Sequence, residues 1–84
     1  MNTSDSFSKS ELLAAPYGVG SYLMLEEYVL ESGDSECFGK LLDDYGAELP
    51  LFKLEHLLRA VYWENDRNTY QRILEVLFRK CTAL

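Results

Sequence analysis

Histidine and cysteine, on which most zinc sites and many catalytic sites depend, are scarce in this sequence. It contains one histidine, His56, and two cysteines, Cys37 and Cys81, which are far apart and form no CxxC pair. A structural zinc site needs four ligands at close spacing, and no nucleophile motif surrounds either cysteine. We therefore expect a non-enzymatic protein with no catalytic residue, no metal site and no cofactor. Because both cysteines fall on the apolar side of an expected helix, we interpret them as reduced core thiols rather than a disulfide.

Loops that bind phosphate or calcium, and segments that enter membranes, are also missing. The glycines of "YGVG", residues 17–20, fit neither nucleotide-binding fingerprint. The acidic residues lack the alternating ligands of an EF-hand loop. No apolar run approaches the roughly 18 residues of a membrane-spanning helix, and the N-terminus has neither the basic nor the apolar region of a signal peptide. We therefore expect a cytoplasmic protein with no membrane partner.

Basic residues are few relative to acidic ones. The sequence has eight Lys and Arg against 14 Asp and Glu, which gives a net charge of −6. Each contact with a nucleic-acid phosphate needs a Lys or Arg, so direct binding to DNA or RNA is not expected. The charge favours either a basic protein partner or simple solubility.

What the sequence does contain is an ordinary globular composition in a short chain. Its 84 residues are 48% hydrophobic and 13% aromatic. We expect the polar residues 1–7 to be a flexible N-terminal arm and residues 8–84 to form a single helical domain. A domain of this size buries only about 60% of its unfolded surface, so its core is marginal. Small domains with marginal cores often dimerise.

The spacing of apolar residues predicts an all-α fold. Ser8 and Glu11 have the spacing of a capping box and begin a short helical turn, which ends before Pro16. Four main helices follow, as a small helical bundle or paired helical hairpins, over residues 21–32, 35–46, 50–63 and from 66–69 to the C-terminus. The last two helices should form an antiparallel hairpin with a short turn.

The same spacing assigns the faces of these helices. Gly18 and Gly20 are expected in a loop, Gly33 should end helix 21–32, and Gly39 indicates a close contact with another helix. The expected buried face of helix 35–46 is Cys37, Phe38, Leu41, Leu42 and Tyr45. That of helix 50–63 is Leu51, Leu54, Leu57, Leu58 and Val61, and that of the last helix is Tyr70, Ile73, Leu74, Leu77, Phe78 and Cys81.

Acidic residues are concentrated in the middle of the chain. Residues 26–48 contain eight acids and one base, a local charge of −7, whereas residues 49–84 contain four acids and six bases, a local charge of +2. This acidic face is a solvated surface, an intramolecular partner for the basic last helix, or a binding surface that resembles a nucleic-acid backbone. Its residues are Glu26, Glu27, Glu31, Asp34, Glu36, Asp43, Asp44 and Glu48.

A second stripe runs beside the leucines of helix 50–63. Its residues stand at i, i+4, i+7 and i+11 and therefore share a helix face. Trp, Arg and Tyr are the residue types most enriched in binding hot spots. The candidate partner-binding residues are Phe52, His56, Arg59 and Trp63, with Arg67 and Tyr70 added from the last helix. The alternative is that Phe52 and Trp63 cover the apolar helix 21–32. If the stripe is an interface, a homodimer with two-fold symmetry is the first candidate.

The segment "HLLRAVYWENDRNTYQRILEVLF" is loosely similar to the end of small enterobacterial biofilm and acid-resistance regulators. The similarity covers under a third of the chain, rests on the spacing of Leu and Tyr, and assigns no role to any residue.

These observations favour a non-enzymatic protein-binding module, namely a small acidic regulator, adaptor or inhibitor of another protein. One alternative is an acidic mimic of nucleic acid that inhibits a DNA- or RNA-binding protein. A second alternative is a helical secretion or assembly chaperone, because helix 21–32 has a wide apolar surface. The mimic should bind its partner with a steep salt dependence, whereas the chaperone should show little.

Overall fold

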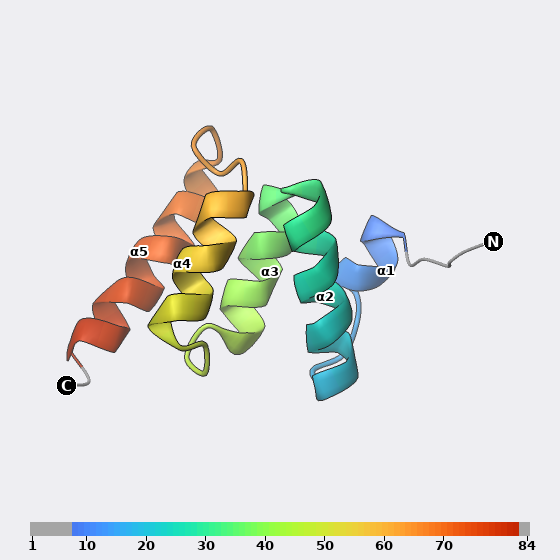
Figure 1. Cartoon of the computed structure of the whole chain (residues 1–84), viewed down its shortest axis with the longest axis horizontal. Coiled ribbons are helices and arrows are strands. Elements are labelled where there is room, and N and C mark those ends of the chain that lie inside the picture. The colour runs from blue at the N-terminus through green and yellow to red at the C-terminus, as the bar shows by residue number, and fades with distance from the viewer. Residues whose placement is uncertain (1–7, 83–84) are drawn as a thin grey trace.

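The computed structural model describes residues 8–82, so the expected arm of residues 1–7 lies outside the described residues. Within residues 8–82 there are five α-helices and no strand, which confirms the expected all-α fold with four main helices after a short N-terminal turn. No helix in that range is both long enough and apolar enough to cross a membrane. The helices are α1 (Lys9–Leu13), α2 (Val19–Ser32), α3 (Ser35–Tyr45), α4 (Leu51–Ala60) and α5 (Arg67–Thr82) (Figure 1).

The capping box at the start of α1 forms as expected. The Ser8 hydroxyl accepts a hydrogen bond from the Glu11 N–H at 3.3 Å, and the Glu11 carboxylate accepts one from the Ser8 N–H at 3.0 Å. The hydrogen bond from the Ser8 N–H is the main reason that the pKa of Glu11 is lowered. This short helix places Leu12 in the core, where it is 3% exposed.

Glycine and aspartate set the boundary between α2 and α3. Gly33 ends α2 in the left-handed conformation, with φ 71°, and its N–H donates to the carbonyl of Val29. Asp34 then caps α3 by accepting a hydrogen bond from the Cys37 N–H at 2.9 Å. The start of α2 was expected later: the helix begins at Val19, so Gly20 is helical instead of part of a loop.

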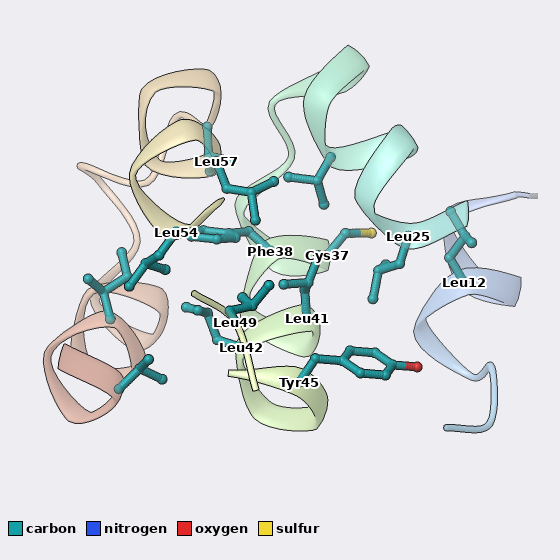
Figure 2. Packing of buried hydrophobic residues seen from close by; sticks show 14 residues of the cluster. Leu12, Leu25, Cys37, Phe38, Leu41, Leu42, Tyr45, Leu49, Leu54 and Leu57 are labelled. Atoms are coloured by element: carbon teal, nitrogen blue, oxygen red, sulfur yellow. The ribbon is translucent and has the colours of Figure 1, made fainter. Parts of the chain in front are cut away.

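α3 is the centre of the fold, and it packs against α1, α2 and α5. Its expected buried face is confirmed, since Cys37, Phe38, Leu41, Leu42 and Tyr45 all belong to the core (Figure 2). Gly39 is also buried, and a Cβ atom there would lie 3.4 Å from the Thr69 hydroxyl of α5. The close helix contact expected at this glycine is therefore present.

The last two helices run antiparallel and are joined by a short connection, as expected (Figure 1), but α4 and α5 do not pack extensively on each other as a hairpin would. α4 packs on α2, and α5 packs on α3. A connection of six residues, 61–66, joins the two helices and turns the chain back (Figure 1).

The expected buried face of α5 is also wrong. Thr69, Ile73 and Val76 are its buried residues, and the Thr69 hydroxyl donates to the Ser35 carbonyl at 3.0 Å. This face is rotated by about one residue from the expected one, because α5 meets α3 beside Gly39 instead of meeting α4. Of the expected residues only Ile73 is buried and Leu77 is half-buried, while Tyr70, Leu74, Phe78 and Cys81 are exposed. Cys81 is therefore not a core thiol.

α4 is shorter than expected and ends at Ala60. Val61 is extended, and the Tyr62 N–H donates to the Gly33 carbonyl at 3.0 Å, so the chain leaves the helix toward the α2–α3 turn. Leu54, Leu57 and Val61 are buried as expected. Leu51, the first residue of α4, is not buried, since 61% of its surface is exposed.

Candidate functional site

Three of the candidate partner-binding residues share the solvent-exposed face of α4. Phe52 is 71% exposed, and His56 is exposed one turn further along. Arg59 follows, with 78% of its side chain exposed, and it forms an ion pair with Glu55 at 3.0 Å. An exposed pair of this kind contributes little to stability. These side chains are thus open to solvent and not used by the core.

Trp63 does not belong to this face, because α4 ends three residues before it. Its ring packs against the core cluster and is half-buried, and its Nε1–H donates to the Leu58 carbonyl at 3.3 Å. The ring also stacks on Tyr70 of α5, with ring centroids 5.8 Å apart and an interplanar angle of 15°. The expectation that Trp63 shares a helix face with Phe52 is therefore wrong, although a contact of Trp63 with a partner stays a prediction. Arg67, the first residue of α5, is exposed.

A larger exposed apolar region involves residues that the sequence assigned to the core. On α5, Tyr70, Leu74 and Phe78 stand at i, i+4 and i+8 and so form one stripe. We name this region, together with the first residues of α4, the α4–α5 surface. Its members are Leu51, Phe52, Tyr70, Leu74 and Phe78, which are 61%, 71%, 47%, 43% and 70% exposed.

Two contacts hold the ends of α4 and α5 in register. At one end the Trp63–Tyr70 stack joins the connection 61–66 to the first turn of α5. At the other end Lys80 donates a hydrogen bond from Nζ to the Leu49 carbonyl, just before α4 begins. The second contact brings Phe78 and Leu51 to the same end of the molecule. The exposed residues at the start of α4 therefore lie at the same end as Phe78, and Leu74 and Tyr70 continue the stripe along α5.

The acidic face is largely neutralised by basic residues of the same chain. Lys53 of α4 pairs with Glu26 at 2.7 Å, and Arg72 of α5 pairs with Asp43 at 2.8 Å. The second pair agrees with the interpretation that the basic last helix packs near acidic α3. The other ion pairs are Lys40–Asp44 at 2.7 Å, Lys9–Asp34 at 3.0 Å and Lys9–Glu36 at 2.8 Å.

The remaining members of the acidic face differ in their surroundings. Glu48 accepts a hydrogen bond from the Tyr17 hydroxyl, at 2.6 and 2.7 Å from its two oxygens. Glu27 and Glu31 are exposed on α2. Only a small part of the sequence-derived face thus presents carboxylates that the chain itself does not engage in these contacts.

The two thiols lie in opposite environments. Cys37 is fully buried, and burial, followed by the neighbouring Asp34 carboxylate, raises the pKa of its thiol to about 12. Cys81 is exposed near the end of α5. Within residues 8–82, no group of three or more His, Cys, Asp or Glu side chains is placed to hold a metal ion.

No known protein family, curated protein or solved structure matches this chain. The loose similarity of the C-terminal segment to bacterial regulators has no support from these comparisons. The site must therefore be interpreted from its own geometry.

Proposed function

We propose that this protein is a non-enzymatic binding module that contacts another protein through the α4–α5 surface. The observation that carries the proposal is the presence of five large apolar side chains, each at least 43% exposed, on two successive helices of a small chain. Single exposed apolar residues are normal on proteins, but a group of them marks an interaction site.

The surroundings of this surface resemble those of a binding hot spot. Aromatic residues are enriched at interface centres, and polar residues commonly form the rim. Phe52, Tyr70 and Phe78 supply aromatic rings, while His56 and Arg59 continue from Phe52 along the exposed face of α4. The stack of Tyr70 on Trp63 restricts the Tyr70 ring before binding, which reduces the entropy lost on association.

A second copy of this chain is the first partner to test. A domain with a marginal core gains stability by burying such a surface in a symmetric dimer. A regulator, adaptor or inhibitor would use the same surface on a different protein.

The two alternative functions receive less support from the packing. A nucleic-acid mimic needs a continuous negative surface, yet five of its eight carboxylates are paired with Lys or Arg of this chain. The chaperone hypothesis relied on an uncovered apolar surface on α2. Much of that surface is covered, because Leu25 and Val29 are buried against neighbouring helices.

The test compares Phe78→Ser and Leu74→Ser with the matched control Leu23→Ser. Leu23 is 55% exposed on α2 and lies outside the α4–α5 surface. Sedimentation velocity over a protein concentration series should show self-association of the wild type and of the control. Phe78→Ser should weaken it by about tenfold or more, the effect expected of a hot-spot residue.

If the wild type stays monomeric, the same variants are used to test binding to a different protein. The wild-type chain and Leu23→Ser, but not Phe78→Ser, should then retain the same protein from an extract of the native host. Equal retention by all three chains, or equal self-association, would reject the α4–α5 surface as the binding site.

A further inference from the structure

A cavity of about 260 Å³ lies at the end of the molecule where α2 begins and α3 ends. Tyr17, just before α2, lines it together with Tyr22 of α2 and Tyr45, the last residue of α3. Glu48, Leu49 and Pro50 close it from the connection between α3 and α4. Three tyrosine rings and a carboxylate therefore meet around one small space.

The three rings are held by contacts with one another. Tyr17 stacks on Tyr45 with ring centroids 4.8 Å apart, and Tyr22 meets Tyr45 edge-on at 5.1 Å. Figure 2 shows Tyr45 at the border of the core, with its hydroxyl directed away from Leu42. Tyr17 is 63% exposed, yet this stack and its hydrogen bond to Glu48 hold it in place. Tyr17 is thus exposed to solvent while its ring and its hydroxyl are both held in place, so it can contact a ligand without first being ordered.

The hydroxyl groups of all three tyrosines already donate hydrogen bonds within the chain. Tyr17 donates to Glu48, Tyr22 donates to Glu26 at 3.0 Å, and Tyr45 donates to the Gly18 carbonyl at 3.2 Å. A ligand in the cavity would thus meet aromatic carbon and the charge of Glu48 instead of hydroxyl donors. Tyr17 covers one face of Tyr45, which is 6% exposed, so Tyr17 and Tyr22 supply most of the ring surface that a ligand would meet. Aromatic rings beside a carboxylate attract cations, because the face of an aromatic ring carries negative electrostatic potential.

We propose that this cavity, which we name the tyrosine cavity, binds a quaternary ammonium group such as the trimethylammonium head of choline or of trimethylated lysine. A primary ammonium carries three N–H donors, which would lose their water in a cavity whose walls are mostly apolar. A quaternary ammonium carries none, and tyrosine-lined cages recognise such groups. The volume is below the roughly 300–1,000 Å³ of sites for drug-sized ligands, so it suits a head group.

The protonation states are consistent with this ligand. The hydrogen bond that Tyr17 donates to Glu48 raises the pKa of Tyr17. Burial, followed by the hydrogen bond to Glu26, raises the pKa of Tyr22 to about 12. Both phenols are therefore neutral at physiological pH.

The experiment is a titration followed by the NMR signals of the tyrosine rings. Choline, tetramethylammonium and trimethyllysine are the cationic probes, and 3,3-dimethylbutan-1-ol is the uncharged analogue of choline with the same shape. We expect the cations, and not the alcohol, to shift the signals of Tyr17, Tyr22 and Tyr45 with millimolar affinity. Tighter binding of choline or of trimethyllysine identifies the source of the head group.

Variants locate the binding and test its physical basis. Tyr17→Ala should weaken choline binding by roughly 3- to 30-fold, the range of one cation–π contact. Glu48→Gln should also weaken it while it keeps an oxygen that accepts from Tyr17. Tyr62→Ala removes an 81% exposed tyrosine that does not line the cavity and should have no effect.

Three results would overturn the proposal: no ring signal shifts with any cation, the uncharged alcohol binds as well as choline, or Glu48→Gln binds choline as well as the wild type does. The last two comparisons keep the test decisive if Tyr17→Ala fails to fold. The tyrosine cavity and the α4–α5 surface share no residue, so each proposal can fail without the other.

Discussion

Trp63 connects the end of one helix to the beginning of the next through three different contacts. Its ring packs on the core, its Nε1–H bonds to the Leu58 carbonyl, and one ring face stacks on Tyr70. The Leu58 carbonyl lies in the last turn of α4, where backbone acceptors lack helical partners. Trp63 therefore replaces part of the hydrogen bonding that α4 loses when it ends at Ala60.

We predict that Trp63→Ala lowers the free energy of unfolding by about 2 kcal/mol. This is less than the ~3–5 kcal/mol of a fully buried tryptophan because the ring is only half-buried. Arg59→Ala should change it by less than about 0.5 kcal/mol, because its ion pair with Glu55 is exposed. Urea unfolding followed by circular dichroism at two protein concentrations measures both effects.

The concentration dependence separates folding from association. A loss for Trp63→Ala that is equal at both concentrations assigns the ring to the fold of the monomer. If the loss appears only at the higher concentration, Trp63 contributes to a dimer and the structural role argued above is incorrect.

At the scale of elements, the turn between α2 and α3 is fitted against the end of α4. Gly33 has a φ of 71°, and a Cβ atom there would lie 2.8 Å from the Tyr62 ring and 2.9 Å from the Ala60 carbonyl oxygen. The Tyr62 N–H bonds to the Gly33 carbonyl across the same contact. One glycine therefore allows both the left-handed end of α2 and the close approach of the segment that leaves α4.

We predict that Gly33→Ala destabilises the protein by more than about 1–2 kcal/mol, the cost of the left-handed conformation alone. Gly20→Ala is the matched control, because this residue is helical and its Cβ atom would meet nothing within 4 Å. It should stabilise the protein by about 0.5 kcal/mol. Thermal unfolding of both variants provides the comparison, and similar melting temperatures for the two would contradict this account of the turn.

Features fixed by a few neighbouring residues could be predicted from the sequence. The capping box of Ser8, the end of α2 at Gly33 and the cap by Asp34 follow from local hydrogen bonding and backbone conformation. Helical spacing also separated Phe52 from the leucine stripe of α4, but it left open whether Phe52 covers α2 or is exposed, as the structure shows.

Features that depend on distant partners could not be predicted. The buried face of α5 includes Thr69, a polar residue whose hydroxyl donates a hydrogen bond to the Ser35 carbonyl, whereas apolar spacing favours Tyr70. No glycine or proline in the sequence marks the end of α4. This end is instead accompanied by a hydrogen bond from the Tyr62 N–H to the distant Gly33 carbonyl. The sequence stripe through Trp63 failed for this reason. Leu51, Leu74 and Phe78 of the α4–α5 surface were assigned to the core, whereas Phe52 was a candidate partner-binding residue and Tyr70 was assigned to both.

For the molecule as a whole, the groups whose pKa values are shifted by folding make its stability depend on pH at both acid and alkaline pH. The hydrogen bond from the Thr69 N–H, with that from the Ser35 hydroxyl, lowers the pKa of Asp66. Burial opposes a similar shift at Asp34, but the bonds from Cys37 and Lys9 prevail and lower its pKa. In the other direction, burial raises the pKa of Cys37 and of Tyr22 to about 12.

We predict a plateau of stability between about pH 5 and pH 8. A carboxyl whose pKa is lowered by folding stabilises the protein above its unfolded pKa of roughly 4, and this contribution is lost as the pH falls through the folded value. A thiol or phenol whose pKa is raised stabilises below its unfolded value, so stability falls above about pH 8.5 for Cys37 and about pH 10 for Tyr22. Urea unfolding across the pH range gives the profile.

A single variant tests the acid side of this profile. Asp66→Ala removes the cap of α5 and should cost about 1 kcal/mol at pH 7. The difference from the wild type should shrink below about pH 4 as Asp66 becomes protonated. A difference that stays constant to pH 2 would show that the charge of Asp66 does not matter.

The packing of α4 on α2 and of α5 on α3 also bears on the order in which the chain assembles. α2 and α3 are consecutive and pack extensively, so they can pair early with little loss of loop entropy. α4 and α5 must close longer loops to reach α2 and α3. Because the connection 61–66 is short, the docking of one of these helices raises the effective concentration of the other at its own docking site. Until they dock, core side chains such as Phe38 and Leu41 stay open to water. A nascent or partly folded chain is therefore most prone to aggregation in the interval before α4 and α5 arrive.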